Sequence, residues 1–166
     1  FNVENMEMVM AVIKAAEEMN SPVIMQTTPS TVKYAGLDYY LAMVKTAAER
    51  SSVPVAMHLD HGSSFELAAQ ALRAGYTSVM IDGSHEDFEG NVAVTKKVAD
   101  MANAMGIPVE AELGKVGGKE DDLEAEADTN TDPEEAREFV ERTGVTSLAV
   151  AIGTAHGFYA STPVLD

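Results

Sequence analysis

The sequence predicts an α/β fold in which parallel strands alternate with helices that cover them. Short apolar runs alternate with longer amphipathic segments along most of the 166 residues, and no hairpin signal joins successive apolar runs. Gly75, Gly106 and Gly144 each follow a helical pattern and precede a strand within three residues, as expected of left-handed residues that end helices. These three observations indicate repeated β-α units of about 30 residues or more.

Hydrophobic periodicity places the elements in order along the chain. The first helix is expected at 6–19, where Met6, Val9, Met10 and Ile13 share one face. The other expected elements are helices at 37–50, 63–75, 88–106 and 132–144, and strands at 21–27, 53–60, 76–82, 107–113 and 145–153.

Two helix starts carry capping signals. Ser63 and Glu66 are spaced as a capping box at the start of the helix 63–75. Asp132 is the expected N-cap of the last helix, with Pro133 at its first position. The acidic stretch EDDLEAEADTNTDPEE (120–135) is expected to be a solvated loop followed by that helix start.

Composition narrows the functional class. The formal net charge of −16 makes nucleic acid and anionic membranes poor partners, because the long-range field repels both. No apolar run reaches the roughly 18 residues that span a bilayer, and no signal peptide is evident. The chain has no cysteine, so it forms no disulfide framework. We expect one cytoplasmic domain over residues 1–166.

Polar residues gather where the predicted strands end, and in parallel α/β folds those carboxyl ends carry the ligand chemistry. The strand ends supply His58, Asp60 and His61; Asp82, Ser84 and His85; Glu110 and Glu112; His156; and Asn2 in the opening residues. In a closed barrel these ends converge on one cavity, whereas in an open sheet they spread along an edge. The first strand is not followed by a G-x-G-x-x-G turn. The barrel is therefore favoured.

Histidine and carboxylate without cysteine form a ligand set for a catalytic divalent metal such as zinc. His61 and His156 are the best ligand candidates, and Asp60 is well placed beside His61 for proton transfer. The structural alternatives are that a lone histidine at a strand end is only hydrogen-bonded, and that Asp82 merely caps the turn DGS at 82–84.

Four segments in order along the whole chain resemble the class II, metal-dependent ketose-bisphosphate aldolases: HLDHG, SVMIDGSH, VEAELGKVGGKEDD and SLAVAIGTAHGFY. The closest subgroups are the fructose-1,6-bisphosphate and tagatose-1,6-bisphosphate aldolases. HLDHGSS leans toward the former and AVAIGTAHGFY toward the latter, so the sugar epimer stays open.

The resemblance implies a TIM (β/α)₈ barrel, here truncated to about strands 1–6. It also implies a lyase of glycolysis and carbohydrate metabolism that reversibly cleaves a ketose 1,6-bisphosphate. The products are dihydroxyacetone phosphate and glyceraldehyde 3-phosphate, formed through a zinc-stabilised enediolate. Full-length relatives of this kind are homodimers or homotetramers.

The resemblance further implies a role for each matching residue. Zinc ligands are His61 and His156, with Asp82 and Glu112 at a second or alternative metal position. The acid/base is Asp60, and the base that deprotonates dihydroxyacetone phosphate is Glu120, in a mobile loop at GGKEDD (117–122). Substrate contacts are Gly157, Asn2 and Thr28. Backbone carbonyls near Ala155 and Gly157 bind Na⁺ or K⁺.

The chain departs from the family pattern in its extent. The family's third histidine ligand and its glycine- and serine-rich phosphate loop come from strand seven, and neither matches a segment of these 166 residues. Two alternatives therefore remain beside the aldolase interpretation. One is a metal-dependent hydrolase on the same barrel, and the other is a non-catalytic fragment.

Overall fold

The computed structural model describes residues 1–120, 123–125, 130–159 and 162–166. Two compact units divide the chain, unit 1 at Phe1–Met80 and unit 2 at Ile81–Asp166. The helices are α1 (Met6–Glu18), α2 (Pro29–Ala35), α3 (Leu37–Arg50), α4 (Phe65–Ala74), α5 (Phe88–Ala104) and α6 (Pro133–Thr143). The strands are β1 (Val23–Thr27), β2 (Val55–Gly62), β3 (Ser78–Ile81), β4 (Val109–Leu113), β5 (Gly117–Glu120), β6 (Leu123–Ala125), β7 (Ser147–Val150) and β8 (Ala155–His156).

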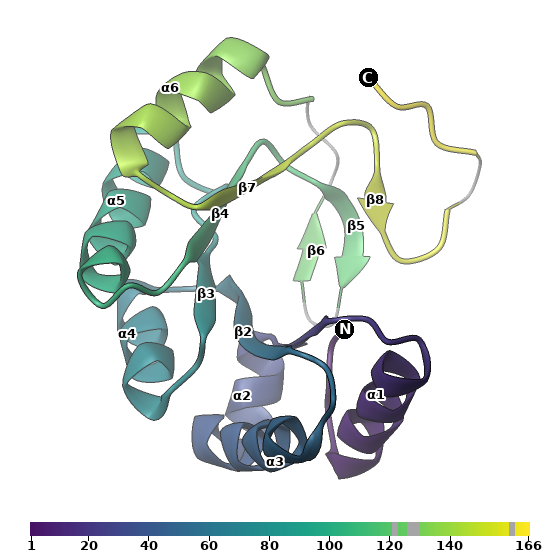
Figure 1. Cartoon of the computed structure of the whole chain (residues 1–166). Coiled ribbons are helices and arrows are strands. Elements are labelled where there is room, and N and C mark those ends of the chain that lie inside the picture. The colour runs from purple at the N-terminus through teal and green to yellow at the C-terminus, as the bar shows by residue number, and fades with distance from the viewer. Residues whose placement is uncertain (121–122, 126–129, 160–161) are drawn as a thin grey trace. The chain divides into compact units, whose positions relative to one another are not determined.

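Hydrogen-bonded strands run in the order β1-β2-β3-β4-β7 in one sheet and β6-β5-β8 in another (Figure 1). The pairs β1/β2 and β4/β7 are both parallel. The predicted α/β class is therefore confirmed, and the five predicted strands are the strands of the larger sheet.

In unit 1, β1 and β2 pair in register from Val23 opposite Val55 to Thr27 opposite Leu59. The core contains fully buried apolar side chains from several elements: Val9, Met25, Tyr40, Val44, Leu59 and Tyr76. The opening residues also behave as a strand, because Asn2 bridges Gln26 in parallel. This agrees with the expectation that Asn2 lies at a strand end.

Tyr76 is a buried residue of this core whose hydroxyl group is hydrogen-bonded. Its hydroxyl lies 2.9 Å from Thr27 Oγ1 at the end of β1, and burial raises the pKa of Tyr76 to about 12. Because burial disfavours the tyrosinate, Tyr76 loses its proton more readily in the unfolded state than in the folded state. The contribution of protonated Tyr76 to the free energy of unfolding is complete below pH 10 and is lost as the pH rises from 10 through 12.

We predict that this loss amounts to roughly 2 to 3 kcal/mol of unfolding free energy, given 1.36 kcal/mol for each pKa unit. Urea unfolding at pH 9 and at pH 11.5, compared between wild type and Tyr76→Phe, should show about 2 kcal/mol of this loss, because pH 11.5 lies just below the folded-state pKa of about 12. The Phe variant should lose less stability over this interval, because Tyr76 no longer contributes. Equal losses in both proteins would contradict the prediction.

In unit 2, β4 and β7 pair in register from Glu110 opposite Ser147 to Leu113 opposite Val150.

Helices α5 and α6 lie side by side (Figure 1). Phe88 and Phe139 join them edge to face with ring centroids 6.1 Å apart. Arg142 lies over the Phe88 ring at 5.6 Å and donates to both carboxylate oxygens of Glu89, at 2.6 and 2.8 Å. These hydrogen bonds lower the pKa of Glu89.

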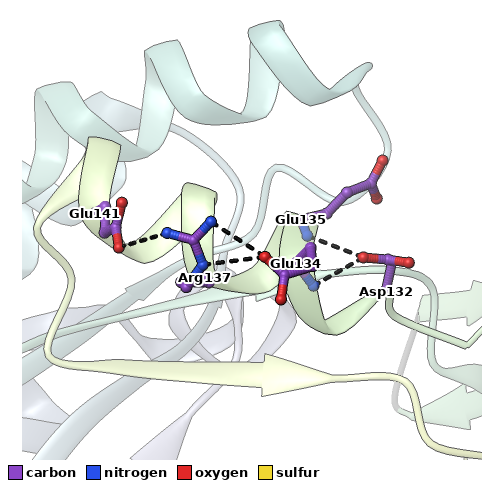
Figure 2. Close-up of polar contacts among 5 residues, drawn as sticks. All are labelled: Asp132, Glu134, Glu135, Arg137 and Glu141. Atoms are coloured by element: carbon purple, nitrogen blue, oxygen red, sulfur yellow. Dashed lines mark hydrogen bonds and ion pairs between the residues drawn. The ribbon is translucent and has the colours of Figure 1, made fainter.

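Helix α6 begins as predicted, with Asp132 as N-cap and Pro133 at its first position. Asp132 Oδ1 accepts from the backbone N–H groups of Glu134 and Glu135 at 2.8 and 3.1 Å. Figure 2 shows this cap, and beside it Arg137 paired with carboxylates on the preceding and following turns. These ion pairs are exposed and contribute little to the stability of the helix, so the N-cap contributes more.

We predict that Asp132→Ala lowers the free energy of unfolding by about 1 to 2 kcal/mol, since two orphan N–H groups lose their acceptor. Asp132→Asn keeps an acceptor oxygen in place and is the matched control, expected within about 0.5 kcal/mol of wild type. Thermal or urea unfolding measures both. An alanine variant as stable as the asparagine variant would contradict the prediction.

Two helix details differ from expectation. The start of α4 is capped by Ser64, whose side chain accepts from Leu67 N at 3.1 Å. The capping box predicted with Ser63 and Glu66 is therefore out of register by one residue. Helix α2 was not predicted, because its seven residues are too short to show a period. The expected helix-ending glycines are confirmed, since Gly75, Gly106 and Gly144 all have positive φ.

The acidic stretch is less irregular than predicted. β5 pairs antiparallel with β6 and parallel with β8, so parts of the expected loop are strands. The glycines Gly117 and Gly118 of β5 and the acidic residues that follow them have low strand propensity, and pairing with other strands overrides that preference. Residues 121–122 and 126–129 of the stretch lie outside the described part of the chain.

Among the described residues, no helix combines the length and the apolar character needed to cross a bilayer.

Candidate metal centre and active site

The end of β2 carries three of the predicted site residues in unit 1. His58, Asp60 and His61 are all buried, although they are polar. His61 adopts φ +46°, a left-handed conformation that is uncommon for a residue other than glycine. Such backbone strain is found disproportionately at functional sites.

Gly62 explains how the backbone at His61 is held. A Cβ at Gly62 would lie 2.2 Å from Met80 O in β3 and 3.1 Å from Leu59 Cδ2. The end of β2 therefore approaches the β3 backbone more closely than any other residue would allow. This close approach fixes the position from which the His61 side chain leaves the strand.

Gln26 connects two of the predicted residues. From β1, its Nε2 donates to Asn2 Oδ1 at 2.7 Å and to Asp60 Oδ2 at 2.5 Å. This amide donor holds the Asp60 carboxylate in one orientation. Gln26 was not among the predicted site residues. The available signal was a glutamine that directly follows the apolar residues VIM of the strand VIMQT.

His58 behaves as a structural histidine. Its Nδ1 lies 2.7 Å from Ser78 Oγ, and burial is the main cause that lowers its pKa to about 4. At neutral pH the ring is therefore neutral, which suits a buried hydrogen-bonded position.

Thr28 follows β1 and is buried. It is the N-cap of α2, and its hydroxyl lies 2.9 Å from Ser30 Oγ and 3.1 Å from Thr31 Oγ1. This hydroxyl is thus engaged in the start of the helix, directly after the strand end where a substrate contact was expected.

In unit 2, the structure brings Asp82 and Glu112 together. Carboxylate oxygens of these two residues lie within 4.8 Å of each other. Glu112 is buried in β4, and Asp82 follows β3 and accepts from Ser84 N at 3.0 Å through Oδ1. The turn-capping role that was the alternative for Asp82 is therefore real, and it orients the carboxylate rather than excluding a second function.

The remaining acidic and imidazole candidates of unit 2 are less enclosed. Glu110 is only partly buried. His85 is exposed, and its Nε2 lies 3.4 Å from Glu86 Oε1, so it has the character of a surface residue.

His156 and its neighbours form β8, which pairs with β5 through Gly117 opposite Ala155 and Gly118 opposite His156. A Cβ at Gly118, whose φ is +101°, would lie 2.3 Å from His156 O. The backbone of Glu120 ends the same strand β5. Gly157 follows with φ +78°. The predicted ligand His156 and the predicted base Glu120 therefore belong to paired strands.

Thr131 is a second residue of this region that was not predicted. Its hydroxyl donates to Leu113 O at 2.6 Å and accepts from Ala151 N at 2.8 Å. It thus joins the ends of β4 and β7, just before the segments that lead to β5 and β8. Nothing in the local sequence distinguished this threonine.

Comparison with known proteins decides the family. A family model described as fructose-bisphosphate aldolase class-II matches residues 1–166. The chain belongs to the class II fructose-bisphosphate aldolase family. The resemblance inferred from HLDHG and the three later segments is thereby confirmed.

Individual aldolases align with nearly the whole of the chain. A protein of Bacillus subtilis (strain 168) named "Probable fructose-bisphosphate aldolase" is 52% identical over 99% of this chain and 59% of its own length. The fructose-bisphosphate aldolase of Thermus caldophilus is 53% identical over 96% of this chain and 52% of its own length. The crystal structure of the YdjI aldolase from Escherichia coli K12 aligns with a TM-score of 0.87 and 45% identity, covering 100% of this chain and 58% of that one.

The chain thus spans between half and three fifths of the length of these aldolases. Its α/β fold matches part of a solved aldolase, which confirms the predicted partial barrel.

The donor set of this family member fits a divalent cation. It offers imidazole nitrogens and carboxylate oxygens without thiolate, the combination found at catalytic zinc sites. Two carboxylates within 4.8 Å also repel each other when both are ionised, and a cation beside them offsets that repulsion.

Proposed function

We propose that the protein is a class II, metal-dependent aldolase that reversibly cleaves a ketose 1,6-bisphosphate to dihydroxyacetone phosphate and glyceraldehyde 3-phosphate. Fructose 1,6-bisphosphate is the preferred substrate, and tagatose 1,6-bisphosphate is the second candidate. The observation that carries the proposal is the family match over the full 166 residues.

His61 and His156 are the proposed ligands of the catalytic zinc, and Asp82 and Glu112 form a second or alternative position. Each of His61, Asp82 and Glu112 offers a ligand atom of a type that zinc accepts. When bound, the cation supplies positive charge to the ketone oxygen at which negative charge develops.

Asp60 is the proposed acid/base that gives a proton to the aldehyde oxygen during condensation. Its burial and the hydrogen bond from Gln26 hold the carboxylate in one orientation, as a proton-transfer group requires. Glu120 is the proposed base that removes a proton from dihydroxyacetone phosphate.

Substrate positioning is assigned to Asn2, Thr28 and Gly157. Asn2 is already oriented by the Gln26 amide, and Gly157 presents its backbone without a side chain. The carbonyls of Ala155 and Gly157 are the proposed ligands of Na⁺ or K⁺. We further propose a cytoplasmic homodimer or homotetramer.

The test is a coupled assay of triose phosphate release with fructose and tagatose 1,6-bisphosphates in parallel. Chelator treatment should abolish release and added Zn²⁺ should restore it, whereas His61→Ala should contain little zinc by elemental analysis and should not recover. Activity that survives complete metal removal would refute the proposal. Release of inorganic phosphate without triose phosphate would favour a hydrolase instead.

A further inference from the structure

Asn91 is a buried polar residue of α5 that the proposed reaction does not use. Its exposed fraction is 2%. Its Nδ2 donates to the backbone carbonyl of Glu112 at 2.8 Å, and its Oδ1 accepts from the Thr95 hydroxyl at 3.0 Å. Because a carbonyl only accepts, the bond to Glu112 fixes which end of the amide faces β4.

The other side of the same amide lies against the segment that follows β3. A Cβ at Gly83 would lie 2.4 Å from Asn91 Oδ1 and 3.0 Å from its Cγ. Gly83 does not have a positive φ, so this contact, rather than backbone conformation, requires glycine there. Asp82 directly precedes it. One side chain therefore touches both backbone segments that carry the carboxylate pair Asp82 and Glu112.

We infer that Asn91 is a positioning residue that sets the separation of the Asp82 and Glu112 carboxylates for metal binding. The inference rests on the proposed function, in which these carboxylates form a metal position. Second-layer hydrogen bonds of this kind orient ligands before the ion arrives and tune its affinity. Asn91 acts through the backbone of Glu112 and does not itself contact metal or substrate.

The test is a double-mutant cycle on zinc affinity, measured in the protein by competition with a chromophoric chelator. Asn91→Ala should weaken Zn²⁺ binding about tenfold. If Asn91 acts through Glu112, the double variant Asn91→Ala/Glu112→Gln should bind zinc within about twofold of Glu112→Gln alone. Independent penalties that multiply in the double variant would overturn the inference.

Val98→Ala is the matched control, because Val98 is fully buried in the same helix and its truncation perturbs packing without removing a hydrogen bond. At comparable loss of thermal stability in the metal-free proteins, Val98→Ala should retain wild-type zinc affinity within about twofold. Equal zinc affinity in Val98→Ala and Asn91→Ala would overturn the inference.

Thr95→Val keeps the amide and removes only the hydroxyl donor. It supplies a milder variant, expected to weaken zinc binding severalfold, if Asn91→Ala does not fold. Unchanged zinc affinity in that variant would overturn the inference. Wild-type protein that binds no zinc would instead refute the proposed function, which separates the two failures.

Discussion

Replacing Asp60 with asparagine is expected to lower the turnover number about 10²- to 10⁴-fold, the range typical of a lost general acid/base. Asparagine has nearly the same shape and keeps an oxygen that accepts from Gln26 Nε2, which lies 2.5 Å from Asp60 Oδ2. It exchanges no proton at neutral pH. Zinc content should therefore stay at the wild-type level, as elemental analysis of the purified variant measures.

Gln26→Met is the companion variant for this experiment. It has a similar volume but no donor, so Asp60 keeps its carboxyl group and loses one orienting hydrogen bond. We expect a smaller loss of turnover, about tenfold, since the chemical group remains while its orientation is less restricted. Turnover of Asp60→Asn within threefold of wild type would remove Asp60 from the mechanism.

Adding a single methyl group at Gly62 is expected to lower both the stability of the protein and its zinc affinity strongly. In Gly62→Ala the new carbon would lie 2.2 Å from Met80 O, so the ends of β2 and β3 must separate. We expect the free energy of unfolding to fall by about 3 kcal/mol or more, because the clash is with backbone and not with a flexible side chain. The shift should also displace His61 and weaken zinc binding at least about tenfold.

Gly106→Ala is the control for this variant. A Cβ there would meet nothing within 4 Å, and only the positive φ of +71° opposes it. The expected cost is about 1 to 2 kcal/mol with unchanged zinc affinity. Urea unfolding and zinc competition compare the two alanine variants, and the assigned role of Gly62 is wrong if both lose the same stability.

Much of this fold could be predicted because its signals are local. The apolar strands and amphipathic helices show their own periods, and Gly75, Gly106 and Gly144 mark where helices end. Asp132 followed by Pro133 gave the start of α6 to the residue. The capping box failed by one position because Ser63 and Ser64 are adjacent and equally able to cap, so only the packing of α4 selects between them.

In the candidate site too, residues with a local sequence signal could be predicted and residues placed by tertiary contacts could not. Asp82 and Glu112 could be named from the sequence because parallel strands deliver their ends to one edge, and the structure brings their carboxylates together. Gln26, Asn91 and Thr131 could not, since each acts through hydrogen bonds to residues 18 to 34 positions away. Such partners depend on tertiary placement, and no spacing in the chain encodes them.

The pairing of Gly118 with His156 has a consequence for timing in the catalytic cycle. Under the proposed roles, the strand that leads to the base Glu120 is bonded along its backbone to the strand that carries a metal ligand. Under those roles, movement of the first strand would be transmitted to the second through this backbone pairing, so the positions of the base and of the metal ligand would be coupled. Gly118 permits this close pairing, because any larger residue would force the two strands apart.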